Sequence, residues 1–322
     1  MMSEAQTGNT MVCIECQIAC QRFGKHRNGL RRFRCATCKR TYTERHERTL
    51  GTMYVSQDRA VLALQLLLEG NSIRSTERIS GIDRNTIMSL LLKAGERCER
   101  LMRERIAGVK VDDVEVDEIW GFVYKKEGHI RPEESRAPIG SAFCFVAMER
   151  STKLVLTWHV GRRNRAHTDI FLGKLRHAVS EDRFQLSTDG FQAYPPAVTS
   201  LLKGRIDYAQ IIKVYGAPRD GEQRYSPAEV ISTEVVPVVG KPKMRRVCTS
   251  HVERQNLTIR MGMRRMTRLT NAFSKKWEHL EAAYALHFAY YNFCRVHKSL
   301  RVTPAMEQGI TDHIWTIAEM IS

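Results

Sequence analysis

The sequence has no uninterrupted run of about 18 apolar residues, the length that a membrane-spanning helix needs. Its start, MMSEAQTGNTMVCIEC, lacks the basic segment and following apolar run of a secretory signal. It also contains no internal repeat and no low-complexity tract. We therefore expect a globular cytoplasmic protein without a membrane partner.

A disulfide framework is not indicated either. The chain has nine cysteines, an odd number, and five of them precede residue 40. The others are scattered at Cys98, Cys144, Cys248 and Cys294. In a cytoplasmic protein, this distribution favours a metal site and ordinary buried thiols over disulfides.

Acidic residues are scarce relative to basic ones. The 322 residues include 51 Lys or Arg against 35 Asp or Glu, a net charge of +16, while a hydrophobic fraction of 43% is enough to bury a core. This imbalance favours a polyanionic partner, most simply nucleic acid. It is extreme between Lys241 and Trp277, where eleven Lys or Arg accompany a single acid, Glu253.

Residues 1–52 are rich in cysteine and show little apolar periodicity, so they need a stabilising cross-link, such as a bound metal ion, in order to fold. Two CxxC pairs can provide the ligands of such an ion: Cys13 with Cys16, and Cys35 with Cys38. Each pair can hold one side of a tetrahedral Zn²⁺, which predicts a ribbon with one structural zinc ion. The alternative is four unrelated thiols.

Residues 53–108 show helical periodicity and predict a helix-turn-helix. Ser72 can cap its first helix, Gly81 permits the tight turn, and Asp83 can cap a second helix that begins at Arg84. The start of that second helix is where a recognition helix reaches base edges. Any short helix pair around a glycine gives this pattern, but the basic segment before it favours DNA binding.

Candidate contacts to double-stranded DNA come from three basic regions. The loop between the cysteine pairs can touch phosphates, or it is a solvated basic loop. The helix-turn-helix can reach bases, and the arginines around Glu253 can hold the backbone. The candidates are Arg31, Arg32, Arg74, Arg84, Asn85, Thr86, Arg254, Arg264 and Arg265.

After residue 110 the pattern changes to β-strands. Three consecutive strands are expected, at 111–124, 141–150 and 153–161. A helix, a strand, a helix and a strand follow. The order βββαβαβ predicts an α/β fold in which helices flank a mixed sheet.

The C-terminal third carries a break and two helices. Residues 217–247, rich in Pro, Gly and charge, predict an irregular insertion. Helices are expected at 251–266 and at about 275–297. Aromatic residues at helical spacing in the second helix indicate core packing rather than a platform for stacked bases.

Two aspartates are placed to share a cation. Asp117 lies within an apolar strand, where a carboxylate is costly unless it is paired or holds a metal. Asp189 ends a later strand at the sheet's carboxyl edge, although an Asp before Gly is often only a turn residue. Strand alternation sends Glu118 to the face opposite Asp117, so we expect only one of these two to be a ligand.

Glu253 supplies a third carboxylate, from the first turn of a helix. Converging carboxylates repel one another unless divalent cations lie between them. Two Mg²⁺ ions, or Mn²⁺, would activate water or a 3′-hydroxyl for attack on a phosphodiester. Arg260, two turns further on the same face, is a candidate phosphate clamp, and His251 and Asn256 can line the site. The alternative for Glu253 is a helix-start carboxylate stabilised by the helix dipole.

These motifs resemble the DDE transposases of bacterial insertion sequences, most closely the insertion-sequence-one family. CIEC with CATC is similar to the family's zinc segment, and SIRSTERISGIDRNTIMSLL to its helix-turn-helix. VDEIWGFVYKKE, LSTDGFQAY and HVERQNLTIRMGMRRMTRLTNAFSKKWEHLEAA resemble the blocks that hold its three acids, and HFAYYNFCRVHKSLRVTPA its C-terminal block. The resemblance implies an RNase H-like catalytic domain over 109–322, with Asp117, Asp189 and Glu253 as the catalytic acids and Arg260 where related enzymes carry Lys or Arg.

The expected function is therefore DNA transposition. The protein would bind the inverted ends of its own mobile element, hydrolyse the 3′ ends and join them to target DNA, as a homodimer or larger oligomer. A metal-dependent nuclease on the same fold and a DNA-binding regulator without enzymatic activity are the alternatives.

Overall fold

The structure, a computed structural model, describes residues 11–26, 29–44, 53–135, 138–216 and 230–322. The chain divides into two compact units, Met1–Ala60 and Val61–Ser322. The further boundary expected at residue 108 lies inside the second unit and stays a prediction. Among the described helices, none is both long and apolar enough to cross a membrane.

The Met1–Ala60 unit contains a small antiparallel sheet in the order β1-β2-β3. Its strands are β1 (Gln21–Lys25), β2 (Arg31–Arg34) and β3 (Thr41–Thr43). Buried Cys13, Cys20, Phe33 and Cys35 form its core, with Tyr42 packed against them. Half of this core is composed of thiols that can bind a metal, as expected for a segment with few apolar residues.

Three helices follow: α1 (Gln57–Leu68), α2 (Ile73–Ser80) and α3 (Arg84–Arg105). The expected caps are confirmed. Ser72 Oγ accepts from Ser75 N at the start of α2, and Gly81 ends that helix with φ +66°. Asp83 accepts from the Asn85 amide at the start of α3. The apolar face of α3 packs against α7 (Trp277–Ala289), so these helices belong to the core of the Val61–Ser322 unit.

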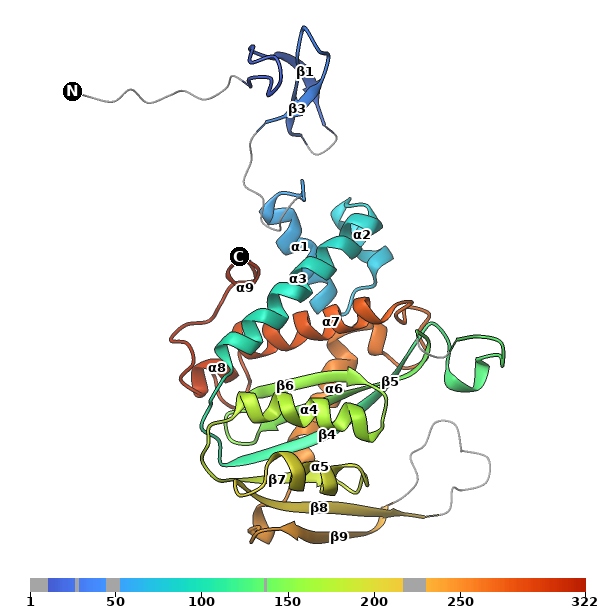
Figure 1. The fold of residues 1–322 in the computed structure, drawn as a ribbon, viewed down its shortest axis with the longest axis vertical. Helices are drawn as coiled ribbons and strands as arrows, with labels where there is room; N and C mark the ends of the chain where they lie inside the picture. Colours follow the sequence, from blue (N-terminus) through green and yellow to red (C-terminus); the bar gives the residue numbers. More distant parts are fainter. Residues whose placement is uncertain (1–10, 27–28, 45–52, 136–137, 217–229) are drawn as a thin grey trace, which may run out of the picture. The chain divides into compact units, whose positions relative to one another are not determined.

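A six-stranded mixed sheet forms the centre of this unit (Figure 1). Its order is β6-β5-β4-β7-β8-β9, in which β4 is parallel to β7 and β7 to β8, while the other pairs are antiparallel. The strands are β4 (Asp113–Val123), β5 (Gly140–Glu149), β6 (Val155–Gly161), β7 (Phe184–Asp189), β8 (Ile206–Tyr215) and β9 (Val230–Val239). The predicted α/β fold with a mixed sheet is confirmed, and β4 to β8 have the RNase H-like order.

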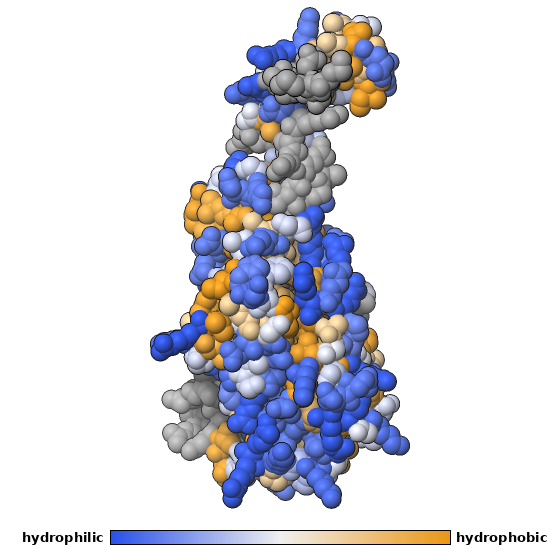
Figure 2. Space-filling model, turned by 90° about the vertical axis from the view of Figure 1, so that its left-hand side faces the viewer, coloured by the Kyte–Doolittle hydropathy of each residue, from blue (hydrophilic) through white to orange (hydrophobic). Residues whose placement is uncertain are grey.

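Helices cover both faces of the sheet. Figure 1 shows α4 (Arg165–Ala178) and α5 (Tyr194–Leu201) in front of the strands, whereas α6 (Ser250–Gly262) passes behind them. The α6 helix contacts β4 and β5. On the face that Figure 2 shows, hydrophilic residues cover most of the surface, as expected for a chain with this charge.

The region predicted as an irregular insertion is partly regular, so that expectation is wrong over β9. A high content of β-branched residues favours the extended conformation in which Val230–Val239 pairs with β8 at the edge of the sheet. Pro237 is tolerated there because an edge strand leaves one row of backbone groups unpaired. Residues 217–229 lie outside the described part of the chain.

The C-terminal helices end earlier than expected. After α6, a 3₁₀ turn spans Arg264–Met266, and after α7 a π-helical turn spans Tyr290–Cys294. Leu280, Tyr284 and Phe288 of the aromatic stripe are buried, which confirms its role in the core. The remaining short helices are α8 (Pro304–Glu307), α9 (Ile317–Met320) and the 3₁₀ turns Glu127–His129 and Met244–Arg246.

Candidate active site and zinc centre

The sheet topology aligns Asp117 with Asp189. Parallel pairing of β4 with β7 sets Glu115 opposite Ser187. Two residues further along each strand, the same register brings Asp117 opposite Asp189, where β7 ends. Asp189 therefore lies at the carboxyl end of β7, where α/β folds gather functional groups, and Asp117 lies beside it on β4, just beyond the point where β4 and β7 stop pairing.

Glu118 joins these two aspartates. Asp117, Glu118 and Asp189 each offer a carboxylate oxygen, and these oxygens lie within 4.8 Å of one another. The expectation that alternation would keep Glu118 away from Asp117 is therefore wrong, whereas which of the two is a metal ligand stays a prediction. Beyond Glu115 the strand β4 no longer pairs with β7, although it stays paired with β5 as far as Val123.

Two residues that sequence reasoning missed hold this acidic cluster. Arg163, from the segment before α4, donates through Nε to Glu118 at 3.2 Å and through a terminal nitrogen to Asp189 at 2.9 Å. The buried hydroxyl of Tyr194, at the start of α5, donates to the other oxygen of Glu118. Nothing in the sequence indicated that Arg163 contacts the acids, because it is far from them along the chain. Tyr194 follows Asp189 by only five residues, but its contact is with the more distant Glu118.

Burial and mutual repulsion oppose full ionisation of the cluster. Burial raises the pKa of Asp117 to about 7, and the charge of Glu118 adds to this effect. Burial likewise raises the pKa of Glu118 to about 7, with a contribution from Asp189. Two carboxyls that ionise near neutral pH, beside a third, form a set of hard oxygen donors that a divalent cation would stabilise.

Glu253, the third predicted catalytic acid, lies outside this group of three. It extends from the first turn of α6, and its side chain is 41% exposed. Lys213 Nζ on β8 lies 2.5 Å from its carboxylate, and the Thr249 hydroxyl donates to it at 2.7 Å. Its charge still contributes to the raised pKa of Asp117. The structure thus brings Asp117 and Asp189 together and holds Glu253 nearby through a lysine.

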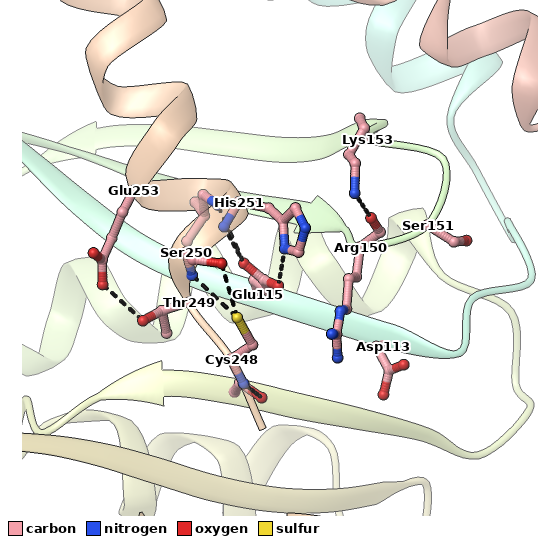
Figure 3. Close-up of polar contacts among 12 residues, drawn as sticks. Asp113, Glu115, Arg150, Ser151, Lys153, Cys248, Thr249, Ser250, His251 and Glu253 are labelled. Atoms are coloured by element: carbon pink, nitrogen blue, oxygen red, sulfur yellow. Dashed lines mark hydrogen bonds and ion pairs between the residues drawn. The ribbon is translucent and has the colours of Figure 1, made fainter. Parts of the chain in front are cut away.

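A buried glutamate fixes the helix that carries Glu253. Glu115, 1% exposed, accepts from the backbone amides of His251 at 2.9 Å and Val252 at 3.2 Å, and His251 Nδ1 lies 2.7 Å from its other oxygen. Figure 3 shows Glu115 facing the first turn of α6, with Thr249 bonded to Glu253. Glu115 therefore occupies the place of an N-cap and ties α6 to β4. Its spacing of two residues from Asp117, on the same face of a strand, is the signal that could have revealed it.

Two further α6 residues reach β4. Asn256 Nδ2 donates to Asp117 at 2.7 Å, whereas its buried Oδ1 has no hydrogen-bond partner among the described residues. Arg260 donates to the carbonyls of Met266 at 2.9 Å and Trp120 at 3.2 Å, and burial lowers its pKa. Asn256 thus lines the acidic cluster, while the role of Arg260 as a phosphate clamp stays a prediction.

The four predicted zinc ligands form a second cluster. The four sulfur atoms, those of Cys13, Cys16, Cys35 and Cys38, all lie within 4.8 Å of one another. Both CxxC turns close in the same way, because the residue after each pair has a positive φ, +52° at position 17 and +60° at position 39. This four-thiol geometry is the one that structural zinc sites use.

The Tyr42 hydroxyl lies 3.1 Å from Cys13 Sγ and, together with backbone amides, lowers the pKa of that thiol to about 6. A metal needs the thiolate, so these donors favour the binding form of Cys13, whereas contacts with the other thiols and burial raise the pKa of Cys16 to about 12.

The candidate DNA contacts differ in exposure. Arg74, Arg84, Asn85, Arg254 and Arg264 are exposed, and Arg31, Arg32 and Thr86 are half-buried. Arg265 differs from the other candidates because its guanidinium is buried and hydrogen-bonded within the protein. Its guanidinium donates to Ser274 Oγ and to the carbonyl of His279, and burial lowers its pKa to about 10. A DNA contact through any of these residues stays a prediction, and Arg265 has a structural role in linking the segment after α6 to α7.

The fold and the acidic cluster define a mixed α/β domain with a candidate divalent-cation site. No protein-family model matches the sequence, and no curated protein does. Solved structures similar to this chain are DNA transposases. The piggyBac transposase synaptic complex with hairpin DNA has 11% identity over 86% of this chain and 71% of that one, with a TM-score of 0.45.

Two Mos1 structures are similar over a smaller part. The Mos1 strand transfer complex has 14% identity, a TM-score of 0.22, and coverage of 51% of this chain and 60% of that one. The Mos1 mariner paired end complex with Mn has 12% identity, a TM-score of 0.20, and coverage of 51% and 61%. This chain thus spans about three fifths of the Mos1 chains. The insertion-sequence-one family is indicated by the sequence motifs alone.

Proposed function

We propose that this protein is a DNA transposase of the DDE type, from an insertion sequence of the insertion-sequence-one family. It binds the terminal inverted repeats of its element and catalyses metal-dependent 3′-end cleavage and strand transfer into target DNA. The observation that carries the proposal is the convergence of Asp117 and Glu118, in the middle of β4, with Asp189 at the end of β7, together with two pKa values near 7.

In this proposal Asp117, Asp189 and Glu253 hold two Mg²⁺ ions, or Mn²⁺, and Glu118 is a further candidate ligand. Bound divalent cations would activate water or a 3′-hydroxyl and stabilise the leaving oxygen. The donor set fits this use, because hard cations prefer carboxylate oxygens and would relieve the repulsion among them. Lys213 neutralises Glu253 until a cation takes its place.

The other residues of the site orient the acids and the substrate. Asn256 holds the carboxylate of Asp117, and Arg163 holds those of Glu118 and Asp189. Arg163 also stacks on Phe191, with its guanidinium carbon 4.1 Å from the ring centroid, which fixes its direction. We propose that Arg260 and the exposed arginines of α6 and the following segment contact the DNA backbone.

Substitution of Asp117 tests the proposal. The full chain, supplied with Mg²⁺, would be incubated with DNA that carries the element ends and with a target plasmid. We expect Asp117→Asn to abolish cleavage and joining while end binding persists, since the charge is lost and the fold is kept. Asp169→Asn, an exposed aspartate on α4, is the matched control and should behave like the wild type.

The products separate the proposal from its alternatives. Joined products support transposition, whereas nicks without joining would indicate a nuclease that uses the same acids. Cleavage by Asp117→Asn at the wild-type rate would refute the assignment of the site. End binding without any Mg²⁺-dependent reaction would instead indicate a DNA-binding regulator.

A further inference from the structure

A large cavity lies in the Val61–Ser322 unit, away from the acidic cluster. Its volume is about 930 Å³, and its walls come from the end of α1, the start of α2, the first turns of α3, the segment 263–276 and α7. Leu68, Leu91, Met263 and Leu286 are among the apolar residues that line it. Its size is at the upper end of the range of ligand-binding cavities, about 300–1,000 Å³.

His287 of α7 lines this cavity and is unusual in two respects. It is 3% exposed, and neither ring nitrogen has a hydrogen-bond partner among the described residues. Burial lowers the pKa of the imidazole to about 3, so the ring is neutral and offers one donor and one acceptor. An unpaired buried polar group destabilises a fold. A ligand that supplies the missing hydrogen bond would explain why a histidine stands among apolar side chains.

The cavity also attracts anions. Five cationic residues line it beside Arg265, namely Arg74, Arg84, Arg264, Lys275 and Lys276, and the described residues that line it include no Asp or Glu. Arg84 is the first residue of α3, the predicted recognition helix. The cavity thus combines apolar walls, several polar side chains including the unpaired His287, and a cationic lining. This combination is complementary to a nucleotide, which joins a flat base that bears polar edges to a charged phosphate.

We propose that this cavity receives one extrahelical nucleobase of the bound DNA. The base lies among the apolar residues with one edge against His287, and the flanking phosphates contact the cationic residues. The inference rests on the proposed DNA binding and adds a second recognition site to it. Because extrusion of a base from a duplex costs unstacking energy, a base that is already unpaired should bind more readily.

The test compares two DNA duplexes that differ by one nucleotide. The full chain is titrated with a matched duplex and with the same duplex carrying a single bulged 2-aminopurine. We expect at least about tenfold tighter binding of the bulged duplex, because its base needs no unpairing. We also expect 2-aminopurine fluorescence to rise as the base leaves its stacked neighbours.

His287→Leu is the informative variant. It removes an unpaired polar group, so its melting temperature should equal or exceed that of the wild type. Its preference for the bulged duplex should fall by about fivefold, the value of one lost hydrogen bond. His129→Leu, an exposed histidine outside the cavity, should change neither quantity. Arg74→Ala should weaken both duplexes equally, as the loss of a phosphate contact does.

Three results would overturn the inference. Equal, tight binding of the two duplexes would refute the cavity's role while leaving the proposed DNA binding intact. Failure to bind either duplex would refute both. Saturable binding of a free deoxynucleoside monophosphate that abolishes the preference for the bulge would show that the cavity takes a small nucleotide instead.

Discussion

At the scale of single residues, the site depends on carboxyl groups that resist ionisation. The raised pKa values of Asp117 and Glu118 mean that the folded protein binds protons more tightly than the unfolded chain does. The resulting stability is present at pH 4 and is lost as the pH rises toward 7. Divalent cations should restore it, because they stabilise the ionised form.

The loss of stability with rising pH gives a prediction for Asp117→Asn. Without Mg²⁺ at pH 8, the variant should be more stable than the wild type by on the order of 1–3 kcal/mol, since it removes a buried charge. At pH 5 the difference should be smaller, and it should vanish only below about pH 4, where Asp117 is protonated in the unfolded chain as well. Thermal unfolding at the two pH values measures this effect. A variant that is less stable than the wild type at pH 8 would show that Asp117 is not held in a repulsive cluster.

The affinity for Mg²⁺ should rise with pH, whereas the stability of the metal-free protein falls. Since Asp117 and Glu118 must lose protons to hold a cation, Mg²⁺ affinity should rise between pH 6 and pH 8, up to about tenfold for each proton released per pH unit. Calorimetric titration of the full chain with Mg²⁺ measures it, and Asp117→Asn should remove the part of the dependence that comes from Asp117 and leave the part that comes from Glu118. A flat pH profile would contradict the raised pKa values.

At the scale of elements, Glu115 determines where α6 begins. A carboxylate on β4 replaces the side-chain cap of the helix and joins the strand of Asp117 to the helix of Glu253. We expect Glu115→Ala to destabilise the fold by about 2–3 kcal/mol, because it leaves buried amides unpaired. Cleavage should fall by more than the unfolded fraction explains. Glu104→Ala, a surface glutamate on α3, is the control, and an unchanged cleavage rate in Glu115→Ala would refute this role.

Elements with a strong period or a clear cap could be predicted from the sequence. Ser72, Gly81 and Asp83 specify the ends of α2 and α3 through local hydrogen bonds, and local signals are visible in a sequence. The succession of three strands, a helix, a strand, a helix and a strand from β4 to β8 could likewise be predicted from local patterns. Strand β9 was missed because its pairing with β8 depends on a partner, not on its own Pro-containing composition.

The residues of the candidate site also fall into two groups, those that a local pattern indicates and those whose contacts depend on the tertiary structure. Asp117 and Asp189 could be predicted, because each marks a position in a strand. The contacts of Arg163 and Tyr194 with Glu118 arise only when loops distant in sequence meet at the sheet edge. Alternation alone also misplaced Glu118, whose carboxylate is held near Asp189 by its contacts with Arg163 and Tyr194.

At the scale of the whole molecule, the two compact units should respond separately to the loss of zinc. The core of the Met1–Ala60 unit is built around its cysteines, whereas the Val61–Ser322 unit has an extensive apolar core. We expect Cys35→Ser to lose the one zinc ion per chain and to weaken end binding. The Mg²⁺-dependent rise in melting temperature should remain. Elemental analysis and thermal unfolding check both results, and loss of the Mg²⁺ effect would show that the units are coupled.

The proposed function, with chemistry at two element ends, predicts that more than one copy of this chain takes part. Each chain carries one group of converging carboxylates among its described residues, and a transposase must cut and join at both ends of its element. We therefore expect at least a homodimer when the full chain binds end DNA. Light scattering coupled to size exclusion, with and without end DNA, measures the mass of the complex. Mixing the wild type with Asp117→Asn should reduce joining more steeply than the inactive fraction, because mixed dimers carry one inactive site. A linear decrease, together with the mass of a single chain per DNA end, would refute the assembly.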